Sequence, residues 1–293
     1  HYSVPFIDRK DILFNDRALA VQVPYADQND PIASATLSTA QRAGWIWDIG
    51  LPTRRGTGHV YSSQYTSEEQ ARDDLQAYLV ATSPGVKVDE LPVRLIEIRP
   101  GYRETFWHKN CVAIGLAGGF LEPLEASALV LVEVGARMLA ENMPNNRQVM
   151  DIVARKFNEK FLFRWKQVIA FLKLHYVLSH RSDSQYWLDN RDPATIPPEL
   201  SELLTLWRSR SPWHLDETHV DEMFPSASYQ YVLYGMGFES EPSTARRRAG
   251  AREQQHAGKL FESNRKMAEK FLANLPTNRE LLRKVGQQGF SKI

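Results

Sequence analysis

A carboxylate, a hydroxyl and the expected start of a helix occur together between residues 119 and 128. The run from Ile114 to Gly119 precedes them, and its glycines allow the backbone to approach another group closely. Pro123 favours the first turn of a helix that would carry Glu125 and Ser127. Because the free amides and the dipole at a helix start attract anions, the segment predicts an anion site beside a carboxylate.

Two tryptophans, Trp45 and Trp47, lie upstream in the run Gly44 to Ile49. Side chains alternate along a strand, so the two indoles are expected on one face, where they would either wall a passage or fill a core. The other residues have similar alternatives. Glu125 in a first helical turn would stabilise the helix by about 0.3 to 1 kcal/mol without any catalytic role. Ser127 would be an ordinary first-turn residue, and a tight bend alone would explain paired glycines.

The elements that must position these residues can be read from the periodicity of the apolar side chains. Alternating or short apolar runs predict strands over 18–24, 45–61 and 92–98, with a turn at 54–58 joining two antiparallel strands. Helices are predicted over 67–82 with Ser67 as N-cap, 124–143, 146–178, from Pro197 onward, and over 250–288 with a break near Pro276. We therefore predict an α+β chain with a sheet-rich part at 1–122 and a helical region at 123–293 that covers the substrate site.

Composition excludes several classes of protein. A net charge of +1 gives no reason to expect nucleic acid or a membrane surface as partner, and no apolar run reaches the ~18 residues that span a bilayer. Cys111 is the single cysteine, which excludes an internal disulfide and a thiolate metal cluster and fits a cytoplasmic location. The eight histidines include no ligand pair, so no metal is predicted, and His175 and His180 are assigned surface or capping roles.

The two motifs together resemble the flavin-dependent tryptophan halogenases. That family has a W-x-W-x-I-P signature followed by G-F-x-E-P-L-E-S-T, and the corresponding segments occur here in the same order. The runs Arg55 to Ser63 and Asn110 to Gly115 are also similar to the family. The likeness is dense from Val4 to Arg137 and thin beyond, and it implies part of a flavin-monooxygenase-like fold.

The resemblance implies that reduced FAD, dioxygen and chloride or bromide generate hypohalous acid, which moves inside the protein to an electron-rich aromatic substrate. It further implies a separate flavin reductase as partner and allows a homodimer. The residue roles that it implies are Glu125 as the catalytic carboxylate; Ser127 and Ala128 at the halide; Leu116, Gly118 and Gly119 at the flavin; and Trp45, Trp47 and Phe224 along the tunnel and at the substrate.

Departures from the family pattern bear on the substrate. Gly50 replaces the proline of the signature, Ala126 replaces the usual serine, and Ala128 replaces a common glycine. The stretch Glu222 to Pro225 lacks the tryptophan that helps to hold free tryptophan in the family. We therefore expect an indole or another electron-rich aromatic, larger or bound to a carrier, and not free tryptophan.

The G-x-G-x-x-G fingerprint for a dinucleotide does not occur in the sequence, and the family's lysine lies upstream of the matching segment. We expect the chain to be the C-terminal part of a longer halogenase. Two other functions remain: a non-catalytic module or remnant that binds an aromatic ligand, and a flavin-dependent aromatic hydroxylase. The retention of Trp45, Trp47 and Glu125 argues against the hydroxylase.

Overall fold

The computed structural model describes residues 3–214, 216, 223–241 and 250–289 of the 293-residue chain. The strands are β1 (Phe6–Asp8), β2 (Arg17–Pro24), β3 (Leu37–Gln41), β4 (Gly44–Gly50), β5 (Arg54–Tyr61), β6 (Arg94–Glu97), β7 (Gly101–Arg103), β8 (Trp107–His108), β9 (Cys111–Val112) and β10 (Gly119–Phe120). The α-helices are α1 (Glu68–Thr82), α2 (Ser127–Glu141), α3 (Arg147–Val177), α4 (Gln185–Asp189), α5 (Pro198–Ser209), α6 (Ser226–Gly235), α7 (Ala251–Asn274) and α8 (Asn278–Gln288).

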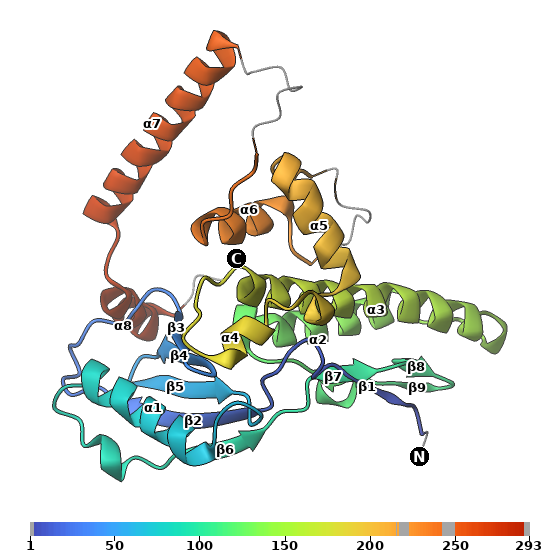
Figure 1. The fold of residues 1–293 in the computed structure, drawn as a ribbon, viewed down its shortest axis with the longest axis horizontal. Coiled ribbons are helices and arrows are strands. Elements are labelled where there is room, and N and C mark those ends of the chain that lie inside the picture. The colour runs from blue at the N-terminus through green and yellow to red at the C-terminus, as the bar shows by residue number, and fades with distance from the viewer. Residues whose placement is uncertain (1–2, 215, 217–222, 242–249, 290–293) are drawn as a thin grey trace.

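Strands precede most of the helices along the chain, which confirms the α+β prediction (Figure 1). The division into parts at 1–122 and 123–293 stays a prediction, although all described strands end before residue 123. One cluster of buried side chains draws on both sides of this boundary, from Ile12 in the first part to Trp187 in the second. None of the described helices is long and apolar enough to cross a bilayer.

A five-stranded antiparallel sheet has the order β3-β4-β5-β2-β6, and α1 covers one of its faces. Ser67 caps α1 by accepting a hydrogen bond from the Gln70 amide, as the sequence predicts. Alternation along β4 sends Ile46 toward α1, while Trp45 and Trp47 face the opposite side. The sheet thereby presents both indoles to the helical part of the chain.

The prediction of a turn at Arg54 to Gly58 is wrong, because these residues form the first part of β5. The hairpin turn lies earlier, where the Leu51 amide donates to the Arg54 carbonyl. Gly58 is required inside the strand, since a Cβ there would overlap the Trp47 ring and the Leu19 carbonyl. Glycine in this run therefore marks a site of close packing, which the composition alone did not separate from a turn.

Helix α3 extends over 31 residues and connects the smaller sheets to the rest of the protein (Figure 1). Near its middle, Phe161 and Trp165 contact Phe106, which precedes β8, with ring centroids 4.7 and 5.8 Å apart. The three-stranded sheet β1-β7-β10 lies beside this contact through Tyr102, whose ring is 5.8 Å from Trp165. Consequently, β10 leads directly from the aromatic core into the segment that carries Glu125.

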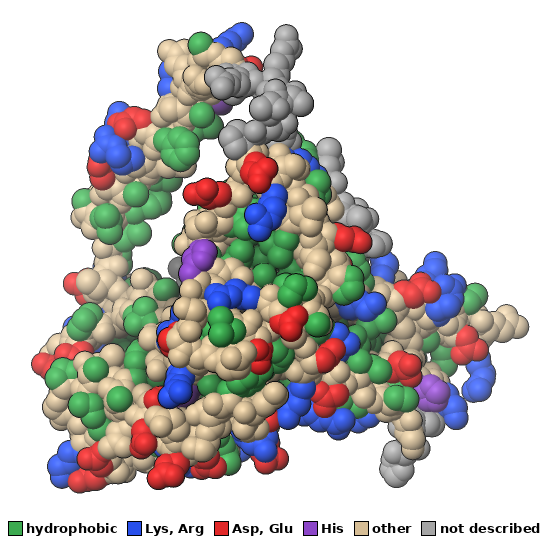
Figure 2. All heavy atoms as spheres, viewed as in Figure 1, with side chains coloured by type: hydrophobic (Ala, Val, Ile, Leu, Met, Phe, Trp, Pro, Cys, Tyr) green, Lys and Arg blue, Asp and Glu red, His purple; other side chains and the backbone are tan. Residues whose placement is uncertain are grey.

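Helix α7 stands away from the other elements and has no buried residue (Figure 1). Its exposed apolar side chains can be seen on the protruding arm in Figure 2. Beyond the break at Pro276, α8 returns to the sheet, where Asn278, Arg279 and Arg283 donate to the segment 29–33. The predicted pair of helices with a break near Pro276 is confirmed.

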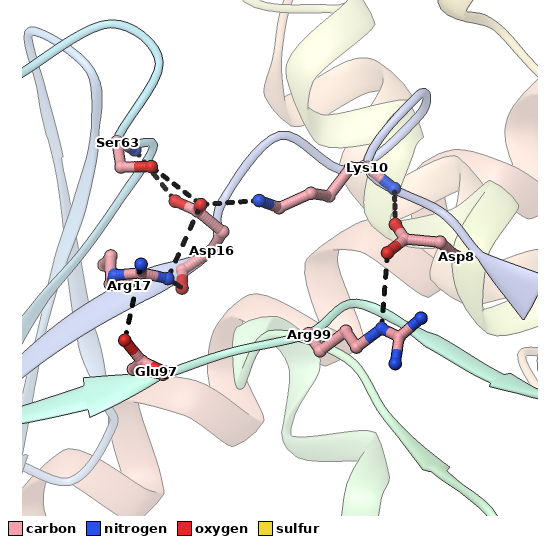
Figure 3. A network of polar contacts seen from close by, with 7 residues as sticks. All are labelled: Asp8, Lys10, Asp16, Arg17, Ser63, Glu97 and Arg99. Atoms are coloured by element: carbon pink, nitrogen blue, oxygen red, sulfur yellow. Dashed lines mark hydrogen bonds and ion pairs between the residues drawn. The ribbon is translucent and has the colours of Figure 1, made fainter. Parts of the chain in front are cut away.

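A polar network fixes the segment between β1 and β2 (Figure 3). Asp16 is 3% exposed and accepts hydrogen bonds from the Lys10 ammonium and from the amide and hydroxyl of Ser63. Burial opposes the ionisation of Asp16, but the hydrogen bonds from Lys10 and Ser63 outweigh it and lower the pKa of this carboxyl. The network anchors the residue next to Asn15, which contributes to the site described below.

Replacing Asp16 with asparagine is expected to lower the free energy of unfolding by about 1 kcal/mol at pH 7, since a charge-assisted hydrogen bond is lost. The folded pKa of Asp16 lies below the unfolded one, so its contribution is complete above about pH 4 and disappears as the pH falls through the folded value. Urea unfolding of both proteins at pH 7 and below pH 4 measures this difference. The exposed Asp11→Asn variant is the control, and a constant difference between the two pH values contradicts the prediction.

Candidate active site

The segment between β10 and α2 forms a strained turn, and the predicted helix start is wrong. Glu125 and Ala126 have left-handed backbone angles, with φ of 64° and 51°, and α2 begins only at Ser127. Such angles in residues other than glycine cost roughly 1 to 3 kcal/mol each and persist only where surrounding contacts enforce them. Glu125 therefore lies in a short, distorted 3-10 turn, Leu124–Ala126, that precedes α2, and it is not a first-turn acid of the α-helix itself.

A contact between Glu125 and α3 helps to hold this strained backbone in place. The His175 ring lies with Nε2 2.9 Å from Glu125 Oε1 and Nδ1 2.9 Å from the Phe171 carbonyl oxygen. Because that carbonyl only accepts, Nδ1 carries a hydrogen, and Nε2 faces the Glu125 carboxyl. The hydrogen bond from His175 lowers the pKa of Glu125, so the carboxylate form prevails at neutral pH.

Sequence reasoning missed His175. Beyond the predicted surface or capping role, its side chain is 19% exposed and pairs with Glu125, a contact that the sequence did not predict. The fifty-residue separation between the two gives no periodic signal. Only the position of His175 in the last turn of α3, beside an aromatic stripe, could have indicated it.

A second carboxylate, Glu122, is buried three residues before Glu125. It is 2% exposed and accepts hydrogen bonds from Asn15 Nδ2 at 2.6 Å and from Trp45 Nε1 at 3.0 Å. The Tyr176 hydroxyl lies 2.8 and 2.7 Å from its two oxygens. Burial raises the pKa of Glu122, and the three donors oppose that rise.

A buried lysine lies beyond these groups. Lys173 is fully buried, donates from Nζ to Asn190 Oδ1 at 2.9 Å and has its ammonium 4.6 Å from the centre of the Phe14 ring. Burial lowers the pKa of Lys173 to about 7, although Glu122 acts in the opposite direction. Two titratable groups near the turn, Glu122 and Lys173, are thus buried, whereas Glu125 is partly exposed.

Trp45 and Trp47 lie together, as the strand periodicity predicts. Their ring centroids are 6.4 Å apart and their planes meet at 64°. Trp45 is buried and reaches Glu122, whereas Trp47 is half-buried and lies over Gly58. One indole is consequently connected to the Glu125 turn by a hydrogen bond, and the other remains partly accessible.

Phe224 is linked to Glu125 only indirectly, through contacts with two intermediate residues. Its ring stacks on Phe171 with centroids 3.9 Å apart and an angle of 16° between the planes. The Phe171 ring in turn lies 5.3 Å from His175, which binds Glu125. Glu222, which belongs to the same predicted substrate stretch as Phe224, lies outside the described residues.

A mainly apolar cavity of about 200 Å³ opens beside the start of α2. Its lining includes the predicted cofactor residues Leu116 and Gly119 and the predicted halide residues Ser127 and Ala128. Ala126 stands at the N-cap of α2 and has no side-chain oxygen, so no side-chain hydrogen bond caps this helix start in the described structure. The first amides of α2 are thus free of a capping side chain, as an anion site requires.

Gly118 and Gly119 also have packing reasons to be glycine. A Cβ on Gly119 would overlap the Gly101 carbonyl oxygen and lie 2.7 Å from Tyr102 Cα, both in β7. A Cβ on Gly118 would lie 3.0 Å from the Ala113 carbonyl oxygen and 3.3 Å from the Phe106 ring. The flavin contact predicted for these residues stays a prediction, and close strand packing is a second requirement at the same positions.

Comparison with known proteins identifies the family to which this chain belongs. The family model described as tryptophan halogenase matches residues 2–252 of the chain. The chain belongs to the tryptophan halogenase family. Membership in this family accounts for the halogenase-like motifs and for the α+β fold.

The structure of this halogenase family member is similar to solved structures of other members. A tryptophan halogenase from Shewanella frigidimarina NCIMB 400 has a TM-score of 0.93 and 51% identity, covering 99% of this chain and 54% of that one. BrvH, a flavin-dependent halogenase from Brevundimonas sp. BAL3, has a TM-score of 0.83 and 32% identity, covering 97% of this chain and 55% of that one.

Among curated proteins, the chain is similar to the 7-chloro-L-tryptophan 6-halogenase KtzR of Kutzneria sp. (strain 744). The two are 32% identical over 288 residues, which make up 96% of this chain and 52% of KtzR. The chain spans about half the length of the curated relatives that it matches.

Proposed function

We propose that the complete protein containing this chain is an FAD-dependent halogenase that uses reduced flavin, dioxygen and chloride or bromide on an electron-rich aromatic substrate. The observation that carries the proposal is the Glu125 turn. There, a carboxylate paired with His175 comes directly before an uncapped helix start that borders a cavity. Membership in the halogenase family supports the same activity.

The residues around the cavity suit a halide and the edge of a flavin. The amides of Ser127 and Ala128 would bind the halide, since a helix start favours anions and no side chain caps it. Leu116, Gly118 and Gly119 would contact the flavin, and the small, apolar lining near two glycines allows close approach. When bound, reduced flavin would supply the two electrons that dioxygen needs to oxidise the halide.

Glu125 would take the proton that the aromatic ring loses when the halogen replaces it. The lowered pKa keeps this carboxyl ionised near neutral pH, which a proton acceptor requires. His175 would hold the carboxylate in place through the bond at 2.9 Å. Trp45 and Trp47 would wall the passage for hypohalous acid and keep bulk water out.

We propose an indole or another electron-rich aromatic as substrate, and not free tryptophan. Phe224 would offer one aromatic face, backed by Phe171, while the sequence at 222–225 lacks the tryptophan that the family uses for the free amino acid. A separate flavin reductase as partner, a homodimer and a cytoplasmic location belong to the same proposal. Cys111 as the only cysteine supports the last of these.

The test supplies the complete protein with FAD, a flavin reductase, dioxygen and bromide, together with a panel of indoles, phenols and free tryptophan. Mass spectrometry detects brominated products, and we expect bromination of an indole or phenol in preference to tryptophan. Oxygenated products alone would indicate the hydroxylase. A protein that binds no flavin would indicate the aromatic-binding module.

A further inference from the structure

We propose that Glu122 and Tyr176 are positioning residues that fix the Glu125 turn and the Trp45 indole against the end of α3. This inference rests on the proposed function and assigns a role to a buried carboxylate that the chemistry does not use directly. Glu122 is 2% exposed, so its carboxylate acts through its neighbours.

The carboxylate of Glu122 joins three segments that are far apart in sequence. Asn15 precedes β2, Trp45 belongs to β4 and Tyr176 lies in the last turn of α3, and each donates a hydrogen bond to Glu122. Asn15 is itself fixed, because its Oδ1 accepts a hydrogen bond from the Tyr186 hydroxyl at 3.0 Å. The three donors thus hold the Glu122 carboxyl from three separate segments of the chain.

The turn is attached to α3 at two adjacent residues. Glu122 hydrogen-bonds Tyr176, and Glu125 hydrogen-bonds His175. The strained backbone of Glu125 and Ala126 therefore follows the first of these contacts by three residues and contains the second. Without Glu122, the turn would lose one of its two side-chain hydrogen bonds to α3, and the strained left-handed angles would be less firmly held. The position of the proposed proton acceptor thus depends on a residue that does not touch the substrate.

The chemistry of the partners explains why an acidic residue stands at 122. The indole Nε1 of Trp45 and the Asn15 amide nitrogen only donate, so the group between them must accept at least two hydrogen bonds. A glutamine could present its carbonyl oxygen to both donors and its amide to the Tyr176 hydroxyl. An alanine would leave these buried donors without an acceptor and would release the turn.

The activity test compares Glu122→Gln, Glu122→Ala and Tyr176→Phe in the complete protein. For Glu122→Ala we expect kcat for bromination to fall about 100-fold, as displacement of a catalytic group by about 1 Å can do, while KM changes little. Glu122→Gln should retain at least about a tenth of the wild-type kcat, because it preserves the hydrogen-bond pattern. A folded Glu122→Ala protein with wild-type kcat would overturn the inference.

The matched control is Asp48→Ala. Asp48 is also a buried carboxylate on β4, where Arg55 and Tyr78 bind it, but it does not contact the turn. We expect this variant to lower the melting temperature and to leave kcat within about twofold of wild type, since distant sites act independently. A loss of kcat in Asp48→Ala equal to that in Glu122→Ala would mean that general destabilisation explains both.

A second readout does not depend on activity. In protein labelled with ¹⁵N-histidine, Glu122→Ala and Tyr176→Phe should shift the His175 ring signal, although neither Glu122 nor Tyr176 bonds to that ring. His175→Gln assigns the signal. If the wild-type protein brominates nothing, the proposed function fails; an unchanged His175 signal in both variants overturns the positioning role itself.

Discussion

Bromination by the complete protein is expected to fall by at least about 100-fold when Glu125 is replaced with glutamine, because an amide cannot accept the proton of the ring. The substitution keeps the shape of the side chain and a polar group that can hydrogen-bond His175 Nε2, so the turn should remain in place. The measurement is kcat and KM for the best substrate of the panel, together with the affinity for reduced flavin.

The control for this variant is Glu133→Gln, which removes a carboxylate from the exposed surface of α2 without touching the turn. We expect it to retain wild-type kinetics. For Glu125→Gln, flavin affinity and melting temperature should stay close to wild type while kcat falls. Unchanged bromination by Glu125→Gln would exclude Glu125 as the proton acceptor and leave only its structural contact with His175.

The largest expected loss of stability follows from replacing Gly119 with alanine. The new Cβ would overlap the Gly101 carbonyl oxygen and crowd the backbone of Tyr102, so β7 and β10 would have to separate. We expect the free energy of unfolding to decrease by about 3 kcal/mol, at the upper end of the range for overpacking. Urea denaturation followed by tryptophan fluorescence measures this change.

The same variant tests whether the glycine also serves the cofactor. Gly258→Ala is the control, because its Cβ would lie in open space on α7 and alanine favours helix over glycine. If the folded fraction of Gly119→Ala binds flavin as tightly as wild type, strand packing alone accounts for the glycine. A stability equal to that of wild type would contradict the clash that the backbone geometry requires.

Sequence patterns predicted the elements wherever local physics determines them. The apolar periodicity placed α3 within one residue of its bounds, and the Ser67 hydroxyl marked the start of α1. The period of two along β4 placed Trp45 and Trp47 on one face. In each of these cases the signal lies within one continuous segment of the chain.

Where distant contacts override local preference, the sequence predictions were wrong. Pro123 favours a helix start, but the contact of Glu125 with His175, fifty residues away, accompanies left-handed angles that delay α2 to Ser127. Arg54 to Gly58 has the composition of a turn, yet Gly58 is needed beneath Trp47 on the neighbouring strand. Glu122 has no signal of its own, because its three donors come from three separate segments.

The attachment of the turn to His175 and Tyr176 limits how this protein can change in length. Adjacent residues of an α-helix project about 100° apart, so the turn holds α3 on two of its sides. Insertion of a single residue within the last turns of α3 would rotate both partners away together. We therefore expect an insertion in the last turns of α3 to displace the Glu125 turn, even though His175 and Tyr176 themselves are unchanged.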